Sequence, residues 1–156
     1  MSSHSDPAVL AELKHLMDAF FGAVSFTPGE QPAYARLREL FIEPGLLIKN
    51  SGTVPEISSV AQFIAPRQAS VDAGDLTRFH EAEIDATTDI FGNVAQRFSA
   101  YVKSGVLKGD SFEARGMIST QFVRTPVGWR ISSMAWDDER AGLELPKLAL
   151  ARVPVR

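Results

Sequence analysis

The sequence contains no cysteine among its 156 residues. Disulfide bonds, thiolate zinc sites and a cysteine nucleophile are therefore excluded. No segment approaches the roughly 20 apolar residues that a membrane-spanning helix requires. Residues 2–6 are polar and lack the basic and apolar regions of a signal peptide. We therefore expect a cytoplasmic protein that does not contact a membrane.

Clusters of basic residues and nucleotide-binding motifs are also missing. The net charge is -3, and no run of Lys or Arg offers the basic face that nucleic-acid binding requires. The sequence has no glycine-rich phosphate loop, no dinucleotide fingerprint, and no HExxH, EF-hand or paired-histidine motif. We therefore predict no cofactor, no metal site and no nucleic-acid partner.

The residues that are present predict a globular domain that begins with a long helix. Hydrophobic residues make up 45% of the chain and charged residues 22%, as in ordinary globular proteins. Asp6-Pro7 is a favourable helix start, because Asp caps free N–H groups and Pro lacks one. Apolar residues then recur with helical spacing as far as Val24, and Thr27-Pro28-Gly29 is expected to end the helix.

Shorter elements are predicted between this helix and the middle of the chain. A second helix is expected from Pro32 to about Leu40. Glu43-Pro44-Gly45 predicts a turn, and Leu46 to Asn50 a short strand. A third helix is expected to begin at Ser58 or Ser59 and to end by Ala73-Gly74. Pro66 is expected to kink it or to split it in two.

The second half of the chain alternates apolar and polar residues, which predicts long strands joined by short turns. Such strands pair antiparallel and form a twisted sheet. The turns are expected at Gly92-Asn93, Ser104-Gly105 and 126–128. The strands are predicted to span Thr77 to Phe91, Asn93 to Lys103, Ser111 to Thr125, and Trp129 to Asp137.

Helices followed by a long antiparallel sheet define an α+β fold in one domain, residues 1–138. Residues 139–156 form a tail with scattered apolar residues and two prolines. Because exposed apolar segments are costly in water, we expect this tail to be docked on the domain or on a partner subunit.

The element order and several short sequence phrases resemble the nuclear transport factor 2-like (NTF2-like) superfamily, close to its SnoaL-like members. The resemblance covers about Val9 to Asp137. The phrases that carry it are Phe63-Ile64-Ala65-Pro66-Arg67, Phe91-Gly92-Asn93-Val94-Ala95-Gln96, Phe98-Ser99-Ala100-Tyr101, Arg115-Gly116-x-x-Ser119-x-Gln121 and Gly128-Trp129-Arg130-Ile131.

The resemblance implies a cone, in which a curved antiparallel sheet wraps three to four N-terminal helices and leaves a cavity open at one end. It also implies a homodimer formed through the sheet face. It does not define an activity, because this fold carries isomerases, dehydratases, cyclases, hydrolases and plain binding proteins.

Polar residues alternate along two of the predicted strands and are candidates for a ligand-binding site. Ser99 and Tyr101 share one face of their strand, and Arg115, Ser119 and Gln121 share a face of theirs. One interpretation is a pocket wall that binds a polar or anionic small molecule, with the Arg115 guanidinium as the anion clamp. The alternative is the solvent side of the sheet or a dimer contact.

Four further residues complete the predicted ligand-binding set. Asn50 is placed to donate to a ligand oxygen, or else ends its strand as a turn residue. Trp136 is expected to wall the pocket mouth. Tyr34 and Phe63 lie on the buried sides of their predicted helices. Tyr101 and Asp137 could share one pocket, but a shift of one residue in register would separate them.

Two groups of titratable residues are candidates for acid–base chemistry. His80 is either a general base beside Glu81 or Glu83, or an exposed strand residue, and the exposed position is favoured. Glu81, Glu83 and Asp85 alternate along one strand. They are interpreted as a solvated face, or as partners of Arg97 and Arg115, rather than as an acid–base group or a cation site.

Three functions are compatible with the sequence. The first is a binding protein with a mainly apolar cavity for an unknown small molecule. The second is a cofactor-free lyase, isomerase or hydrolase that acts on a cyclic or aromatic molecule by acid–base catalysis. The third is a protein-interaction module that uses the sheet face. A polar dyad inside the cavity would favour the enzyme, and a filled cavity would favour the interaction module.

Overall fold

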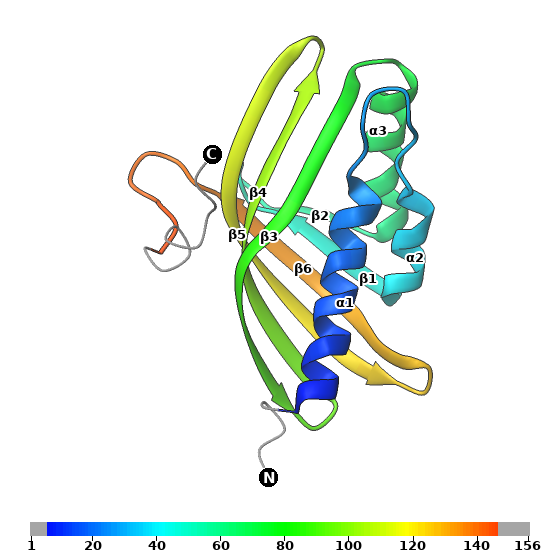
Figure 1. The fold of residues 1–156 in the computed structure, drawn as a ribbon, viewed down its shortest axis with the longest axis vertical. Helices are drawn as coiled ribbons and strands as arrows, with labels where there is room; N and C mark the ends of the chain where they lie inside the picture. The colour runs from blue at the N-terminus through cyan, green and yellow to red at the C-terminus, as the bar shows by residue number, and fades with distance from the viewer. Residues whose placement is uncertain (1–5, 147–156) are drawn as a thin grey trace.

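The computed structural model describes residues 6–146. A curved six-stranded sheet has three helices on one side and the segment after the last strand on the other (Figure 1). The strands, in their order across the sheet, are β2 (Glu56–Ser58), β1 (Phe41–Lys49), β6 (Gly128–Asp138), β5 (Asp110–Thr125), β4 (Val94–Leu107) and β3 (Leu76–Phe91). We call the side that carries the helices the inner face and the opposite side the outer face. The α+β class is confirmed.

Helix α1, Pro7–Val24, begins as the sequence predicts. The Asp6 carboxylate accepts hydrogen bonds from the backbone N–H groups of Ala8 (3.0 Å) and Val9 (3.3 Å). The apolar stripe is buried against the sheet. The helix ends before the predicted breaker, because Phe26 leaves it to pair with Phe79 as an isolated bridge.

The second helical segment and the strand after it differ from the prediction. A short 3-10 helix, η2 (Tyr34–Arg36), runs into a single turn of helix, α2 (Leu37–Leu40). Strand β1, Phe41–Lys49, already begins there, so Glu43-Pro44-Gly45 is not a turn between elements. It is an irregularity inside β1, where pairing with β6 is interrupted between Phe41 and Leu46.

Helix α3, Val60–Asp72, is one continuous helix, so of the two outcomes predicted at Pro66, a kink or a split, the split is wrong. Ser59 caps it through a capping box: its hydroxyl accepts from the Gln62 N–H, and the Gln62 side chain accepts from the Ser59 N–H. Phe63 and Ile64 are buried one turn before the proline. The cap and this packing hold a helix that lacks one backbone hydrogen bond.

The four long strands are confirmed, with one turn in a different place. They are β3 (Leu76–Phe91), β4 (Val94–Leu107), β5 (Asp110–Thr125) and β6 (Gly128–Asp138), all paired antiparallel. Ser104-Gly105 does not form the second turn. The chain turns at Lys108-Gly109, where both residues have positive φ (51° and 82°), as a tight hairpin requires.

Gly105 is needed inside β4 because aromatic rings approach it from both neighbouring strands. The Phe79 and Phe112 rings have centroids 6.2 Å apart, and both residues pair with Gly105. A Cβ atom on Gly105 would lie 2.6 Å from the Phe112 ring and 2.5 Å from the Arg78 carbonyl oxygen.

We expect Gly105→Ala to lower the free energy of unfolding by about 1–3 kcal/mol, since the added methyl group overpacks the site. Urea denaturation checks this value. Gly22→Ala is the matched control, because Gly22 lies within α1 and has open space around it. That control is expected to be neutral or slightly stabilising. Equal stability of Gly105→Ala and the native protein would contradict the packing described for β4.

The sequence interpretation assumed a purely antiparallel sheet, but the sheet contains one parallel pair of strands. Strand β1 pairs with β6 in parallel, with Leu47 opposite Met134 and Lys49 opposite Trp136. A short strand that the sequence did not predict, β2 (Glu56–Ser58), extends the edge by pairing antiparallel with β1. This arrangement brings the end of β1 beside the end of β6.

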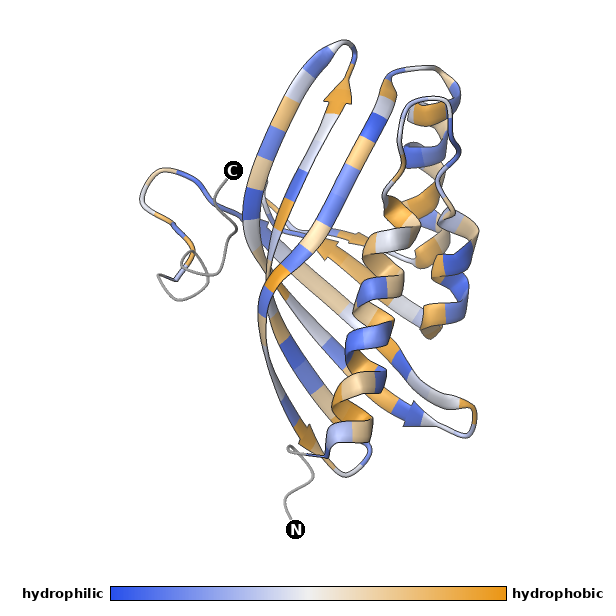
Figure 2. Ribbon diagram, in the orientation of Figure 1, coloured by the Kyte–Doolittle hydropathy of each residue, from blue (hydrophilic) through white to orange (hydrophobic). Residues whose placement is uncertain are grey.

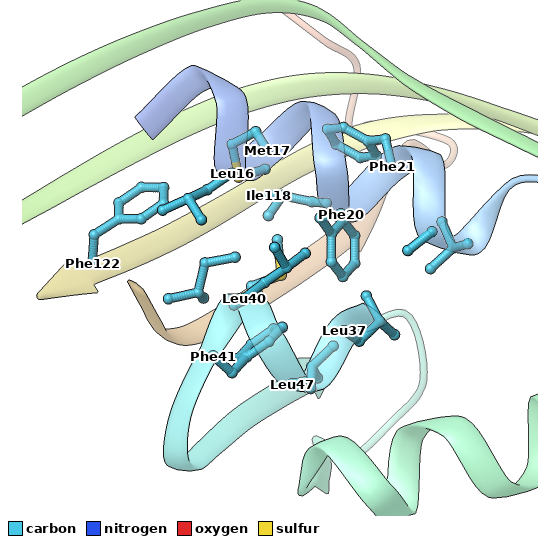
Figure 3. Close-up of a cluster of buried hydrophobic side chains, with 14 of the residues drawn as sticks. Leu16, Met17, Phe20, Phe21, Leu37, Leu40, Phe41, Leu47, Ile118 and Phe122 are labelled. Carbon is cyan, nitrogen blue, oxygen red and sulfur yellow. The ribbon is translucent and has the colours of Figure 1, made fainter. Parts of the chain in front are cut away.

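The core lies between the inner face of the sheet and the helices. Side chains from α1 interdigitate with Leu37, Leu40, Phe41 and Leu47 below them and with strand residues such as Phe122 (Figure 3). Hydrophobic and hydrophilic residues alternate along much of the strands (Figure 2). Successive side chains of a strand point to opposite faces, so this pattern separates the two kinds of residue. The core therefore joins α1, α2 and α3 to the inner face of the sheet.

Part of the predicted tail is described. Leu145 is buried on the outer face against Ala100 and Met117. The Leu145 N–H donates to the Glu139 carboxylate (2.7 Å), and that carboxylate lies 3.4 Å from the Arg115 Nε. Residues 147–156 of the predicted tail lie outside the described residues.

Candidate functional site

A pocket of about 330 Å³ lies between α3 and the inner face of the sheet. It is lined mainly by apolar and aromatic side chains from α1, α3 and the strands, and its polar lining is concentrated in a few residues. The lining residues are Phe20, Val24, Tyr34, Lys49, Phe63, Pro66, Arg67, Ser70, Leu76, Phe79, Glu81, Lys103, Leu107, Phe112, Ile118 and Trp136.

Glu81 is the only carboxylate in the pocket lining among residues 6–146, and it faces a lysine. It is paired with Lys103 across strands β3 and β4. Directly opposed residues of an antiparallel pair project to the same face, so both side chains enter the pocket. The two residues form a polar dyad in a largely apolar environment.

The environment of Glu81 changes its protonation equilibrium. Burial raises the pKa of the Glu81 carboxyl to about 7, because desolvation penalises the charged form. The positive charge of Lys103 opposes this shift, the Asp138 carboxylate adds to it, and Arg67 opposes it. A carboxyl group that titrates near neutral pH is suited to accept or donate a proton under physiological conditions.

A short network behind the dyad fixes Lys103. The Lys103 ammonium lies 3.0 Å from the Asp138 carboxylate. The Tyr101 hydroxyl donates to the same carboxylate and lies 3.1 Å from the Asp137 carbonyl oxygen. Burial, and then the hydrogen bond to Asp138, raise the pKa of Tyr101, so this hydroxyl stays protonated. The network holds the Lys103 side chain in place, and none of these contacts involves the Glu81 carboxyl.

Arg67 lies on the α3 wall of the pocket, against the ring of Phe63. Its guanidinium carbon is 3.6 Å from the ring centroid, and its Nη1 donates to the Phe63 carbonyl oxygen (3.0 Å). Burial lowers the pKa of Arg67 from its ordinary value, while the neighbouring Tyr34 opposes that change. Burial also raises the pKa of Tyr34, so its hydroxyl remains a donor.

Glu83, two residues after Glu81 on the same inner face, has a different environment. Its carboxylate accepts two hydrogen bonds from the Arg97 guanidinium (3.0 and 2.6 Å) and one from the Ser99 hydroxyl (2.7 Å). Arg97 also donates to Thr88 (2.8 Å). The side chains of Arg97 and Glu83 are only 10% and 9% exposed, so this is a buried, bidentate ion pair.

The predicted ligand-binding residues fall into three groups. Tyr34, Phe63 and Trp136 line the pocket. Ser99 and Tyr101 share a face, as alternation predicts, and the structure puts this face on the inner side, but their hydroxyl groups are bonded to Glu83 and Asp138. Their role in ligand binding stays a prediction.

The other four predicted residues lie outside this pocket. Arg115, Ser119 and Gln121 share a face, as predicted, but the register of β5 against β4 puts it on the outer side of the sheet. Arg115 pairs there with Glu139. Asn50 borders a second pocket, of about 340 Å³, beside residues 143–145. Phe98, 51% exposed, lies on the same outer face, and a dimer through this face stays a prediction.

The acid–base candidates lie on both faces of the sheet, with Glu81 and Glu83 on the inner face. His80 is exposed, as favoured from the sequence. Glu83 pairs with Arg97, one of the partners named for this row. The solvated-face interpretation is wrong for Glu81 and Glu83. A register shift between Glu83 and Asp85 ends the predicted alternation, so Asp85 does not continue their row.

Glu81 lines the pocket but was not among the ligand-binding residues predicted from the sequence. A glutamate between Phe79 and Ile84 on a long strand, opposite a lysine, is a weak signal that only the pairing of β3 with β4 makes specific. Among residues 6–146, no group of three or more His, Cys, Asp or Glu side chains is arranged to hold a metal ion. No helix in the same range has the length and hydropathy needed to cross a membrane.

Comparisons with known proteins identify the fold. No protein-family model matches the sequence, and no curated protein matches it. Solved structures do match. An NTF2-like superfamily protein from Salmonella enterica serovar Typhimurium superposes with a TM-score of 0.70 at 14% identity, over 85% of this chain and 92% of the other.

Two further structures agree. A protein from Kribbella flavida gives a TM-score of 0.69 at 20% identity, over 87% of this chain and 96% of its own. An NTF2-like protein of unknown function from Prochlorococcus gives 0.67 at 15% identity, over 90% and 95%. The chain therefore has the NTF2-like fold, as the sequence resemblance implies. These identities establish the fold alone, and the SnoaL-like branch stays a prediction.

Proposed function

We propose that this protein is a cofactor-free acid–base enzyme that binds a small cyclic or aromatic molecule in the pocket under α3. The observation that carries the proposal is the Glu81 carboxyl, which faces Lys103 in an aromatic pocket with a pKa of about 7. A polar dyad in the pocket favours an enzyme over a plain binding protein. The reaction class is a lyase, isomerase or hydrolase reaction that begins with proton transfer.

The pocket supplies the other requirements of such a reaction. Its aromatic and aliphatic walls bury a ring and exclude water, which strengthens the basicity of an ionised carboxylate. At neutral pH, a large fraction of Glu81 is ionised and can accept a proton. The Lys103 ammonium, held by Asp138, is placed to stabilise negative charge that develops on the substrate.

A model reaction tests Glu81 without knowledge of the natural substrate. The substrate is a nitrobenzisoxazole. A base removes the proton from the C–H group of its five-membered ring, and the N–O bond breaks. The ring opens to a single coloured product, a nitrophenolate that carries a nitrile group. We expect the native protein to catalyse this elimination with a rate that rises with pH through about 7 as Glu81 ionises. Glu81→Gln is expected to lower the rate by about 100-fold or more.

Glu113→Gln is the matched control, since Glu113 is an exposed carboxylate on the outer face of β5. It is expected to retain the native rate and pH profile. A Glu81→Gln variant with the native rate would refute the assignment of Glu81 as the base. Binding of the probe with no turnover would instead support a small-molecule binding protein that uses the same pocket.

A further inference from the structure

We propose that the pocket binds its substrate through an anionic group, a carboxylate or an oxyanion attached to an aromatic or cyclic ring, and that Arg67 holds this group. The inference rests on the proposed function, because it names the class of molecule on which Glu81 acts. The anion site at Arg67 lies on a different wall of the pocket from Glu81 and is tested by ligand binding, not by catalysis. Either proposal can therefore fail without the other.

Cationic side chains outnumber carboxylates in the lining of the pocket. Three cationic residues, Lys49, Arg67 and Lys103, face the single carboxylate of Glu81. Lys103 is compensated by Asp138 at 3.0 Å. None of the ion pairs among residues 6–146 involves Arg67 or Lys49. The Glu81 and Glu56 carboxylates act on Arg67 only at longer range, and Glu56 is paired with Lys49 across strands β1 and β2. Among the described residues, Arg67 therefore has no carboxylate in direct contact, and the anionic group of a ligand would supply that contact.

Arg67 is pre-organised for this role. The stacking on Phe63 and the hydrogen bond from its Nη1 to the Phe63 carbonyl oxygen fix the plane of the guanidinium. No other hydrogen bond from Arg67 is formed among the described residues, so N–H groups remain for a ligand. A partly desolvated guanidinium forms strong, charge-assisted hydrogen bonds with a carboxylate. The protonated Tyr34 hydroxyl, on the same side of the pocket, is a further donor.

The remaining walls define the body of the ligand. Phe20, Phe79, Phe112 and Trp136 line the pocket together with Phe63. The Phe63 and Trp136 rings meet edge to face, with centroids 6.1 Å apart. Aromatic walls of this kind favour flat rings, and a volume of about 330 Å³ suits a small molecule. The expected ligand is therefore a flat ring system with one anionic substituent.

Naphthoate and naphthamide test the inference, because they share a shape and differ in charge. Calorimetry at about pH 6 keeps naphthoate ionised while Glu81 is mostly protonated. We expect the native protein to bind naphthoate at least about tenfold more tightly than naphthamide, which corresponds to about 1.4 kcal/mol. Arg67→Met is expected to remove this preference while changing naphthamide affinity by less than about threefold.

Arg115→Met is the matched control, because Arg115 lies on the outer face and pairs with Glu139. It is expected to keep the native preference. If Arg67→Met does not fold, isotope-labelled arginine in the native protein provides the second measurement. Naphthoate is then expected to shift the NMR signals of the Arg67 side chain, and naphthamide to leave them nearly unchanged.

The outcomes separate the two proposals. Equal affinity of the native protein for both compounds, or an unchanged preference in Arg67→Met, would overturn the anion site and leave Glu81 as the base. Failure of both compounds to bind the native protein would overturn the anion site and also count against the pocket as a substrate site. Loss of the naphthoate preference in Arg67→Met alone would support the inference.

Discussion

Glu81→Gln is expected to stabilise the folded protein by about 3 kcal/mol at about pH 8 and to have little effect below about pH 4.5. The physical reason is the raised pKa of Glu81 in the folded state, from 4.5 to about 7. Each pKa unit corresponds to about 1.4 kcal/mol of difference between the two protonation states. An ionised Glu81 is therefore a destabilising group in its partly buried position, and glutamine removes that charge.

The pH window follows from the direction of the shift. Below about pH 4.5, Glu81 is protonated in both the folded and the unfolded states. In this range no buried charge has to be formed, so Glu81 does not reduce the stability of the native protein. Between pH 4.5 and about 7, the unfolded state ionises while the folded state keeps its proton, so the native protein loses stability. Glutamine cannot ionise, and the difference between variant and native protein grows over this interval.

Urea denaturation of both proteins across this pH range measures the difference directly. Glu113→Gln again serves as the control and is expected to follow the native curve within about 0.5 kcal/mol, as exposed substitutions usually do. A constant difference between Glu81→Gln and the native protein at all pH values would show that Glu81 is not buried as described. Increased stability with lost activity is the trade-off expected of a functional residue.

Glu83→Gln is expected to have the opposite effect and to lower the free energy of unfolding by about 3–5 kcal/mol at neutral pH. Glu83 neutralises Arg97 through two hydrogen bonds and also accepts from Ser99. Without the carboxylate charge, the guanidinium of Arg97 remains buried and uncompensated. The whole stability of a domain of this size is about 5–15 kcal/mol, so this loss is a large fraction of it.

A double variant separates the loss of the ion pair from a general intolerance of the site. Glu83→Gln combined with Arg97→Met removes both charges and is expected to recover much of the lost stability, because an apolar replacement of a buried pair is often close to neutral. Chemical denaturation of the single and double variants gives the coupling energy. A cost below about 1 kcal/mol for Glu83→Gln would contradict the buried ion pair.

Sequence patterns predicted the elements whose signals are local. The apolar stripe of α1, the Asp6 cap and the four long strands were correctly predicted, and Ser59 is one of the two residues predicted to begin α3. Each follows from the spacing of side chains or from one residue that satisfies free backbone groups. Ser104-Gly105 also carried a local turn signal, but it was overridden by the Phe79 and Phe112 rings that pack across Gly105.

The candidate site depends on pairings between segments far apart in the chain. The sequence left open whether Tyr101 and Asp137 share one pocket, and the register of β5 and β6 puts the side chain of Asp138 beside Tyr101. The Asp137 side chain pairs with Arg140 instead. A shift of one residue reverses the face of a strand, so alternation alone could not choose between these two carboxylates.

The sequence by itself determined the α+β class, the helical start, the long strands and which residues of a strand share a face, because these depend on local periodicity. Only the tertiary structure decided which face meets the helices. That choice moved Arg115 to the outside, put Arg67 on the pocket wall, and gave Glu81 and Glu83 different partners. Burial and charge then set the pKa of Glu81. Desolvation and electrostatic interactions arise from neighbours in space, which no pattern along the chain specifies.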